Sequence, residues 1–176
     1  MKQKVLLIFF VLGMLTSSSL DAQKNQVNVS GSVYFPLAIP GGEDSKGYGI
    51  SLSRQHFFSE QWSFDLNTGY IYFSGEFVDW HGDKQNHFAL IPVSIGARYY
   101  LHNFFAGLHT GFAIKASSNA GTNLLFSPFI GYRTNKFQFS AKLLGIPQTF
   151  ATYPEKTFFQ KGGYSYLGFG VDYRFK

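Results

Sequence analysis

An eight-stranded antiparallel up-and-down transmembrane β-barrel is the all-β fold class that the sequence predicts, and three observations predict it. The chain divides into eight segments in which apolar and other residues alternate. Only 14% of the residues are charged, against about 25% in soluble domains, while 19% are aromatic. The chain also opens on an export signal, so the apolar face of each strand is expected to point outward into lipid.

The first 22 residues have the organisation of a secretory signal peptide. Lys2 and Lys4 give a basic start, Val5–Leu15 is an apolar run, and a small, polar stretch ends at Ala22. An uncleaved anchor is the alternative, but this apolar run is shorter than the roughly 20 residues that a spanning helix needs. We therefore expect residues 1–22 to be removed and residues 23–176 to form a single barrel domain.

The first four segments place apolar side chains at alternate positions, as strands with one apolar face require. They are about 26–37 with Val27, Val29, Val33 and Phe35; 47–57 with Tyr48, Ile50 and Leu52; 62–73 with Trp62, Phe64, Leu66, Tyr70 and Tyr72; and 89–101 with Ile91, Val93, Ile95, Ala97 and Tyr99. Each is close to the roughly 9–11 residues that a tilted strand needs to cross a bilayer.

The last four segments follow the same rule. They are about 104–116 with Phe104, Ala106, Leu108, Phe112 and Ile114; 124–133 with Leu124, Phe126, Ile130 and Tyr132; 137–146 with Phe137, Phe139, Ala141 and Leu143; and a closing strand from Ser165 with Leu167, Phe169, Val171, Tyr173 and Phe175. In the closing strand, Gly168, Gly170, Asp172 and Arg174 lie between the apolar residues. A strand at the very end of the chain would close the barrel.

The connections alternate in length. Residues 58–61, 102–103 and 134–136 make short turns, whereas 38–46, 74–88, 117–123 and 147–161 make longer loops. Short turns on the periplasmic side and longer loops outside are the habit of outer-membrane barrels. An even number of strands then places both termini on the short-turn side.

Aromatic residues gather at both ends of the segments, as in the two girdles of a membrane barrel. Two prolines, Pro92 and Pro128, fall inside segments, and we expect each at a bulge or a strand end because proline cannot donate to the ladder. The girdle residues are Trp62, Tyr99, Tyr100, Phe104, Tyr132, Phe137, Tyr173 and Phe175 beside the short turns, and Tyr34, Phe35, Tyr48, Tyr70, Tyr72, Phe112, Phe126 and Tyr164 beside the long loops.

Charge and cysteine content exclude several classes of protein. The formal charge of +5 falls to +4 once the signal, with its two lysines and Asp21, is removed, and no cluster of basic residues suited to nucleic acid is present. The chain has no cysteine, so it has neither a disulfide nor a thiolate metal site. We expect no cofactor and no nucleic-acid partner.

The end of the chain resembles a known biogenesis signal. Gly170, Tyr173 and Phe175 are spaced like the C-terminal signal read by the barrel-assembly machinery, although Gly168 replaces the usual polar residue and Lys176 follows the phenylalanine. Residues 91–100 also resemble the fourth strand of the small outer-membrane barrels of the OmpX-like and PorT-like family. The resemblance implies an integral protein of a Gram-negative outer membrane, surrounded by lipid and assembled by that machinery.

With the apolar phase outward, the other phase carries polar and charged residues into the lumen. An eight-stranded lumen is just wide enough for side chains to fill it, so we expect a hydrogen-bonded polar core and not a channel. Buried charges must pair, and we expect Asp65 to pair with Arg98 and Asp172 with Arg133, Lys142 or Arg174. The expected lumen network is Asp65, Arg98, His109, Lys115, Arg133, Gln138, Lys142, Asp172 and Arg174.

Two other classes of function stay open. A lipid A deacylase or acyltransferase would need a lipid-facing Ser/His pair near the outer rim, whereas His109 points inward and is expected to be a satisfied lumen histidine. A soluble lipocalin-like barrel would turn its apolar phase inward around a ligand. The loop residues Asp79, His81 and Asp83 could hold a metal only if the loop curled, and we expect none there.

The loop 147–161 is rich in aromatic residues, which are unusual in a solvated loop. They either fold over the barrel mouth as a plug or dock a partner. The expected role is therefore non-enzymatic: a membrane scaffold whose long loops serve contact, adhesion or membership of an outer-membrane protein complex. The residues of this plug or partner loop are Phe150, Tyr153, Phe158 and Phe159.

Overall fold

The computed structural model describes residues 25–38, 45–78, 84–116, 122–147 and 164–175, and their regular structure is entirely β-strand. No helix long and apolar enough to span a membrane occurs within these residues. The strands are β1 (Asn25–Ala38), β2 (Lys46–Phe57), β3 (Trp62–Val78), β4 (Lys84–Leu101), β5 (Phe104–Lys115), β6 (Thr122–Arg133), β7 (Phe137–Ile146) and β8 (Tyr164–Phe175).

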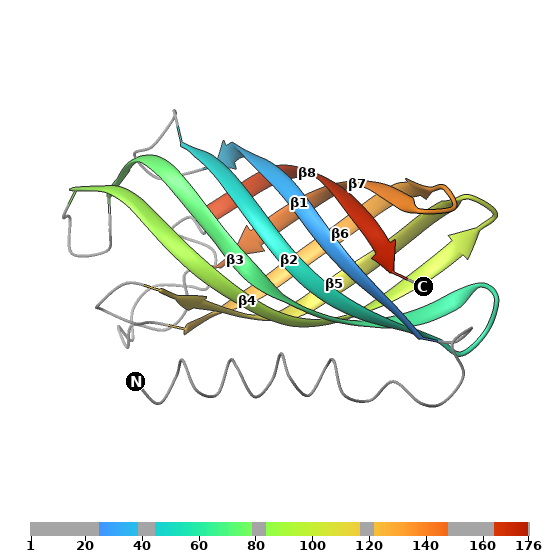
Figure 1. The fold of residues 1–176 in the computed structure, drawn as a ribbon. Coiled ribbons are helices and arrows are strands. Elements are labelled where there is room, and N and C mark those ends of the chain that lie inside the picture. Colours follow the sequence, from blue (N-terminus) through green and yellow to red (C-terminus); the bar gives the residue numbers. More distant parts are fainter. Residues whose placement is uncertain (1–24, 39–44, 79–83, 117–121, 148–163, 176) are drawn as a thin grey trace.

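The eight strands form a closed antiparallel barrel in which each strand pairs with its sequence neighbours and β8 returns to pair with β1 (Figure 1). The predicted fold class is therefore confirmed. The turns 58–61, 102–103 and 134–136 lie together at one end, with the end of β8, and we call this the short-turn end (Figure 1). The opposite end is called the long-loop end.

One connection is shorter than predicted. Strands β3 and β4 extend to Val78 and Lys84, so their connection is 79–83 and not 74–88. The alternation that marks a strand is broken here because the register shifts between Ser74 and Phe77, and Gly75 has a φ of 129°. Only glycine adopts this backbone conformation readily. The bulge breaks the alternation of apolar and polar residues, so the part of the hairpin beyond it was not predicted as strand.

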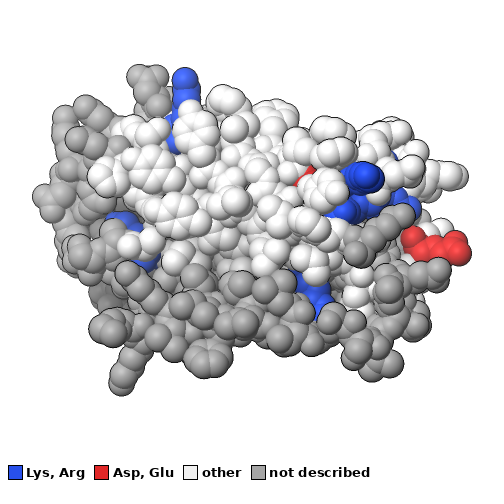
Figure 2. Space-filling view, viewed as in Figure 1, with Lys and Arg blue, Asp and Glu red and all other residues white. Residues whose placement is uncertain are grey.

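The apolar phase of the strands faces outward, as predicted. In β8, Phe169, Val171 and Phe175 are 46%, 44% and 50% exposed, whereas Asp172 is 8% exposed. On the face shown in Figure 2, uncharged residues dominate the described surface between the two ends. A surface of this kind would be unfavourable in water and is matched to hydrocarbon.

The two prolines do not lie at bulges. The β3–β4 ladder passes from Thr68↔Val93 to Ile71↔Leu90 around Pro92 with no shift of register. Likewise, Pro128 pairs with Leu108 on β5, and the β6–β7 ladder resumes in register beyond it. The expectation of a bulge or a strand end was wrong, since both prolines lie inside their strands. Each proline interrupts the ladder on one side only and keeps its place opposite the other neighbour.

Outward aromatic rings at the short-turn end are paired across strands. Trp62 and Tyr99 have ring centroids 5.0 Å apart, and Phe104 and Tyr132 are 5.2 Å apart, each pair in direct register. The Phe137–Tyr173 pair on β7 and β8 repeats the arrangement at 5.5 Å. Three residues predicted for the girdles face inward and were wrongly assigned: Tyr34, Tyr100 and Tyr164. Tyr34 and Tyr100 are each adjacent to an outward aromatic residue, Phe35 and Tyr99, whereas Tyr164 shares the inward phase of the buried Tyr166.

Side chains fill the lumen in three layers. At the long-loop end an apolar cluster closes the bore, and at the short-turn end a smaller cluster holds Tyr100, Phe105 and Phe129, with Phe57 against it. A polar layer lies between these clusters. The long-loop cluster, called the apolar cap below, is Tyr34, Ile71, Phe73, Phe88, Leu90, Ala113, Leu125, Leu144, Ile146 and Tyr166, with the partly buried Tyr164.

Candidate functional site

The strand register brings the central residues of the polar layer together. Asp65 on β3 lies opposite Gly96 on β4, which lies opposite His109 on β5. A side chain at Gly96 would start 1.9 Å from the His109 ring, so glycine leaves the space through which His109 reaches Asp65. Asp65 and His109 therefore meet across a strand that contributes no side chain between them.

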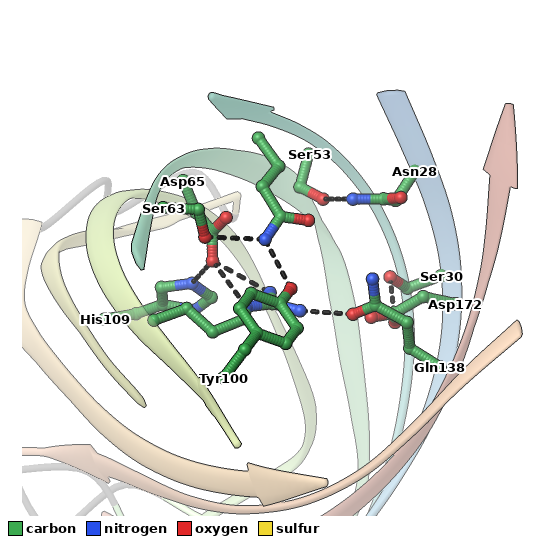
Figure 3. Close-up of polar contacts among 11 residues, drawn as sticks. Asn28, Ser30, Ser53, Ser63, Asp65, Tyr100, His109, Gln138 and Asp172 are labelled. Carbon is green, nitrogen blue, oxygen red and sulfur yellow. Dashed lines mark hydrogen bonds and ion pairs between the residues drawn. The ribbon is translucent and has the colours of Figure 1, made fainter. Parts of the chain in front are cut away.

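Asp65 is the centre of a buried ionic cluster (Figure 3). Arg98 Nη2 lies 2.8 Å from Asp65 Oδ2, and Arg98 Nε donates a second hydrogen bond to the same oxygen at 3.0 Å. His109 Nε2 is 3.2 Å from it, and Arg98 also donates to Gln138 Oε1 on β7. Because the Asp65 and Arg98 side chains are 0% and 4% exposed, removing either would leave a charge buried without its partner.

Aromatic rings hold the Arg98 guanidinium in place. Its central carbon lies 4.8 Å from the ring centroid of Phe105 and 5.0 Å from that of Phe129. A planar guanidinium can contact ring faces while its edge N–H groups bind a carboxylate, whereas a lysine ammonium cannot do both. The cluster is therefore specific for arginine at this position.

Uncharged polar groups extend the network around the lumen wall. Gln55 Nε2 donates to Ser63 Oγ at 2.6 Å and to Tyr100 Oη at 2.5 Å, and Asn28 donates to Ser53 Oγ at 3.2 Å (Figure 3). These residues come from four strands, so the network ties together β1, β2, β3 and β4. Fully buried polar groups of this kind are stable only when hydrogen bonded.

Asp172 does not make the ion pair that the sequence predicted. Its Oδ1 accepts a hydrogen bond from Ser30 Oγ at 2.5 Å, and no described residue pairs with it as a cation, so the expected pairing with Arg133, Lys142 or Arg174 was wrong. The physical reason is that Asp172 and Lys142 lie at different heights along the barrel axis. Register places Asp172 opposite Gln138 and Ser30, whereas Lys142 lies opposite Gly168, further toward the long loops.

Lys142 binds hydroxyl groups instead. Its Nζ donates to Ser32 Oγ at 3.1 Å and lies 5.7 Å from the centroid of the Tyr34 ring. A side chain on Gly170 would start 3.0 Å from Ser32 Oγ and 3.3 Å from Lys142 Nζ. The absence of a side chain at Gly170 thus leaves polar space beside the ammonium group, and a lumen of this kind is best satisfied by water.

The remaining predicted lumen residues lie nearer the ends. Lys115 is partly buried opposite Leu90, beside the apolar cap. Arg133 lies over the Tyr100 ring at 4.3 Å, and Arg174 donates to the carbonyl oxygens of Thr134 and Asn135 in a short turn. These three cations therefore do not join the ionic cluster around Asp65.

The enclosed space in the polar layer is small. A cavity of about 60 Å³ lies between Ser30, Ser94, His109, Lys142 and Asp172, among other residues. At 10–15 Å³ per water position this holds roughly four to six waters. Such waters would serve Ser94 Oγ, a buried hydroxyl of the cavity wall that has no protein partner among the described residues. The layer is a solvated polar core closed at the long-loop end by the apolar cap.

The predicted assembly residues lie on the last strand. Gly170 faces the lumen, while Tyr173 and Phe175 face outward with their rings 5.0 Å apart. Recognition of these residues by an assembly machinery stays a prediction. The signal segment 1–22, the loop residues Asp79, His81 and Asp83, and the plug or partner residues Phe150, Tyr153, Phe158 and Phe159 lie outside the described residues. Among those that are described, no group of three metal-ligating side chains occurs.

Sequence reasoning missed the apolar cap. At the long-loop end both phases of a strand are apolar, as in the run Tyr70-Ile71-Tyr72-Phe73, and only every second residue was assigned a role. The outward Tyr70 and Tyr72 resemble a girdle, and they conceal the inward Ile71 and Phe73. The signal that could have revealed the cap is this loss of polar alternation, confined to one end of several strands.

Comparison with known proteins supports the fold and gives no family. No protein-family model matches the chain, and no curated protein matches it either. Among solved structures, a transmembrane β-barrel designed de novo matches with a TM-score of 0.51 at 8% identity, over 89% of this chain and 100% of the designed one. At this identity the match shows the fold alone.

Two natural outer-membrane proteins are more distant in shape. The N-terminal β-barrel domain of Pseudomonas aeruginosa OprF matches with a TM-score of 0.46 at 20% identity, over 86% of this chain and 98% of that chain. The Yersinia pestis outer-membrane protein Ail matches with a TM-score of 0.49 at 12% identity, over 86% of this chain and 100% of that chain.

Proposed function

We propose that this chain is a non-enzymatic integral protein of a bacterial outer membrane, a closed barrel that carries its long loops to the outside. The observation that supports this most is the continuous outward apolar surface around a charged, hydrogen-bonded interior. A soluble ligand-binding barrel would have the opposite arrangement, with its charges in water. The small cavity and the apolar cap also argue against a conduit.

The finer role proposed is that of a scaffold. Within the described strands the outer surface is mostly apolar and the lumen is filled by side chains, which favours the long-loop connections as the parts used for recognition. Contact with other cells, adhesion, or membership of an outer-membrane protein complex would use these loops. The last strand would be read by the barrel-assembly machinery through Gly170, Tyr173 and Phe175.

Cell fractionation with a gel-shift assay tests the membrane placement. We expect the mature chain in the outer-membrane pellet, resistant to carbonate extraction, and migrating faster on SDS gels when unheated than when boiled. A closed barrel with a dry, paired ladder resists detergent at room temperature because it offers no strand edge. Recovery in the soluble periplasm, with migration that heating does not change, would overturn the proposal.

One outward pair bears on the enzymatic alternative. Ser74 on β3 lies directly opposite His87 on β4 near the long-loop end, where His87 stacks on Tyr72 with ring centroids 5.9 Å apart. This is the Ser/His placement that a lipid-modifying barrel would need. However, Ser74 Oγ donates to the Lys46 carbonyl oxygen at 3.4 Å and not to His87, so the histidine is not placed to activate it.

The non-enzymatic proposal therefore predicts that Ser74→Ala has no chemical consequence. We expect identical lipid A acylation, measured by mass spectrometry, in cells that express the wild type, the Ser74→Ala variant or neither. If the wild type removes or adds an acyl chain and Ser74→Ala abolishes that change, the pair is a catalytic dyad and the scaffold proposal fails.

A further inference from the structure

Two arginines at the short-turn end are not used by the polar layer. Arg133 on β6 and Arg174 on β8 line one pocket of about 480 Å³ at the rim of the barrel. Its other lining residues are Asn103, Tyr132, Thr134 and Asn135, none of which is acidic. Two positive charges thus share one pocket that has no carboxylate in its wall.

Both guanidiniums have N–H groups without a hydrogen-bond partner among the described residues. The Arg133 guanidinium lies over the Tyr100 ring at 4.3 Å, an arrangement that leaves in-plane N–H groups able to bind an acceptor. Arg174 uses Nη2 to donate to the carbonyl oxygens of Thr134 and Asn135, but its buried Nε has no partner among those residues. An unpaired buried donor favours a ligand that accepts hydrogen bonds.

The pocket lies at the level of the outward aromatic pairs. Tyr132 lines it, packs on Phe104 with ring centroids 5.2 Å apart, and accepts a hydrogen bond from Asn103 Nδ2 at 3.4 Å. Paired rings of this kind mark the boundary between hydrocarbon and headgroups. Basic atoms are visible at the same end in Figure 2. Arg133 and Arg174 are the last inward-phase residues of β6 and β8, so the pocket lies at the short-turn mouth of the barrel, at the height of the headgroups of a surrounding leaflet.

We propose that this pocket binds the phosphate group of an anionic phospholipid of the leaflet at the short-turn face. A phosphate matches the fork of a guanidinium with two parallel hydrogen bonds, and Arg133 offers that fork while Arg174 supplies the second charge. The Asn103 amide is within the same wall and can donate to a headgroup oxygen. The inference rests on the membrane placement proposed above.

Native mass spectrometry of the intact mature barrel tests the site. The protein is purified in micelles that contain phosphatidylglycerol or phosphatidylcholine, and retained lipid is counted for the wild type, Arg133→Gln and the control Lys136→Gln. Lys136 is a basic residue of the same exposed turn that does not line the pocket. Arg133→Gln keeps the Arg174 hydrogen bonds to the turn, so its barrel should remain folded and heat-modifiable.

We expect the wild type and Lys136→Gln to retain phosphatidylglycerol in preference to phosphatidylcholine, and Arg133→Gln to lose roughly tenfold in affinity for it. Equal retention by Arg133→Gln and the wild type, in a barrel that still fractionates with the outer membrane, would overturn this inference and leave the membrane placement intact. Displacement of the lipid by inorganic phosphate or by poly-glutamate at micromolar concentration would also overturn it, because the site would then read a soluble anion or an acidic chain.

Discussion

Replacement of Arg98 by methionine is expected to lower the free energy of unfolding by about 3–5 kcal/mol, because Asp65 would keep a buried charge without its partner. The two side chains are 4% and 0% exposed, so the carboxylate left behind would be shielded from bulk water. The measurement is urea unfolding from phosphatidylcholine vesicles, followed by tryptophan fluorescence. A loss of less than about 1 kcal/mol, as for exposed pairs, would show that the cluster is open to bulk water and that the lumen is not closed.

A double-mutant cycle separates the pair from its surroundings. Asp65→Asn together with Arg98→Met should be more stable than the sum of the two single effects allows, by a coupling energy of roughly 0.5–3 kcal/mol. His109 binds Asp65 and Gln138 binds Arg98, so each single variant also loses one of these contacts, and the cycle subtracts that loss from the coupling energy. Lys136→Met, at an exposed turn residue, is the control and should change stability by no more than about 0.5 kcal/mol.

Arginine on the outer face is the second change with a large expected effect. Ile95 is 59% exposed near the middle of β4, and Ile95→Arg should destabilise the barrel in a bilayer by about 2–4 kcal/mol. The reason is that a guanidinium at the midplane must leave water for hydrocarbon. Refolding yield into vesicles, and the unfolding free energy measured as above, report the loss.

The matched control uses the same strand and the same face. Leu101 is 57% exposed at the short-turn end of β4, and Leu101→Arg should cost only about 0–1 kcal/mol because its charge reaches the headgroups. In water both positions are simply exposed, so a soluble barrel would tolerate both substitutions equally. Equal stability of the two variants in vesicles would therefore contradict the outward-facing membrane surface.

The strand order and the outer face could be predicted because each depends on local pattern. Alternation of apolar and polar residues identifies a strand. A register shift of one residue would turn every side chain to the other face, so the pattern alone assigns a residue such as Val171 to the outer face. Contacts between neighbouring strands can be predicted almost as well. Asp65 and Arg98 lie on the consecutive strands β3 and β4, two positions apart in register and on the same inward face, which puts their side chains within reach of each other.

Contacts across the lumen could not be predicted from pattern, because they depend on how far the strands are staggered around the barrel. Arg98 on β4 donates to Gln138 on β7, three strands away, and no spacing in the sequence reveals that they share a height. The same stagger takes Asp172 away from the cations expected to neutralise it and toward Ser30. The apolar cap was missed for another reason. Adjacent apolar residues at the long-loop end face lipid and lumen in turn, so the sequence there shows no alternation that separates the two faces.

The pairing of β1 with β8, called the seam here, determines when the barrel can close. Val27 pairs with Phe175 and Ala38 with Ser165, so β1 and β8 each lack one neighbouring strand until they pair with each other. The Ser30–Asp172 hydrogen bond crosses this seam and joins residues 142 positions apart. Closure is thus an event of high contact order that cannot occur before β8 has been synthesised. Until then both strand edges are open, and a chaperone or an assembly catalyst that covers them would protect the nascent protein from aggregation.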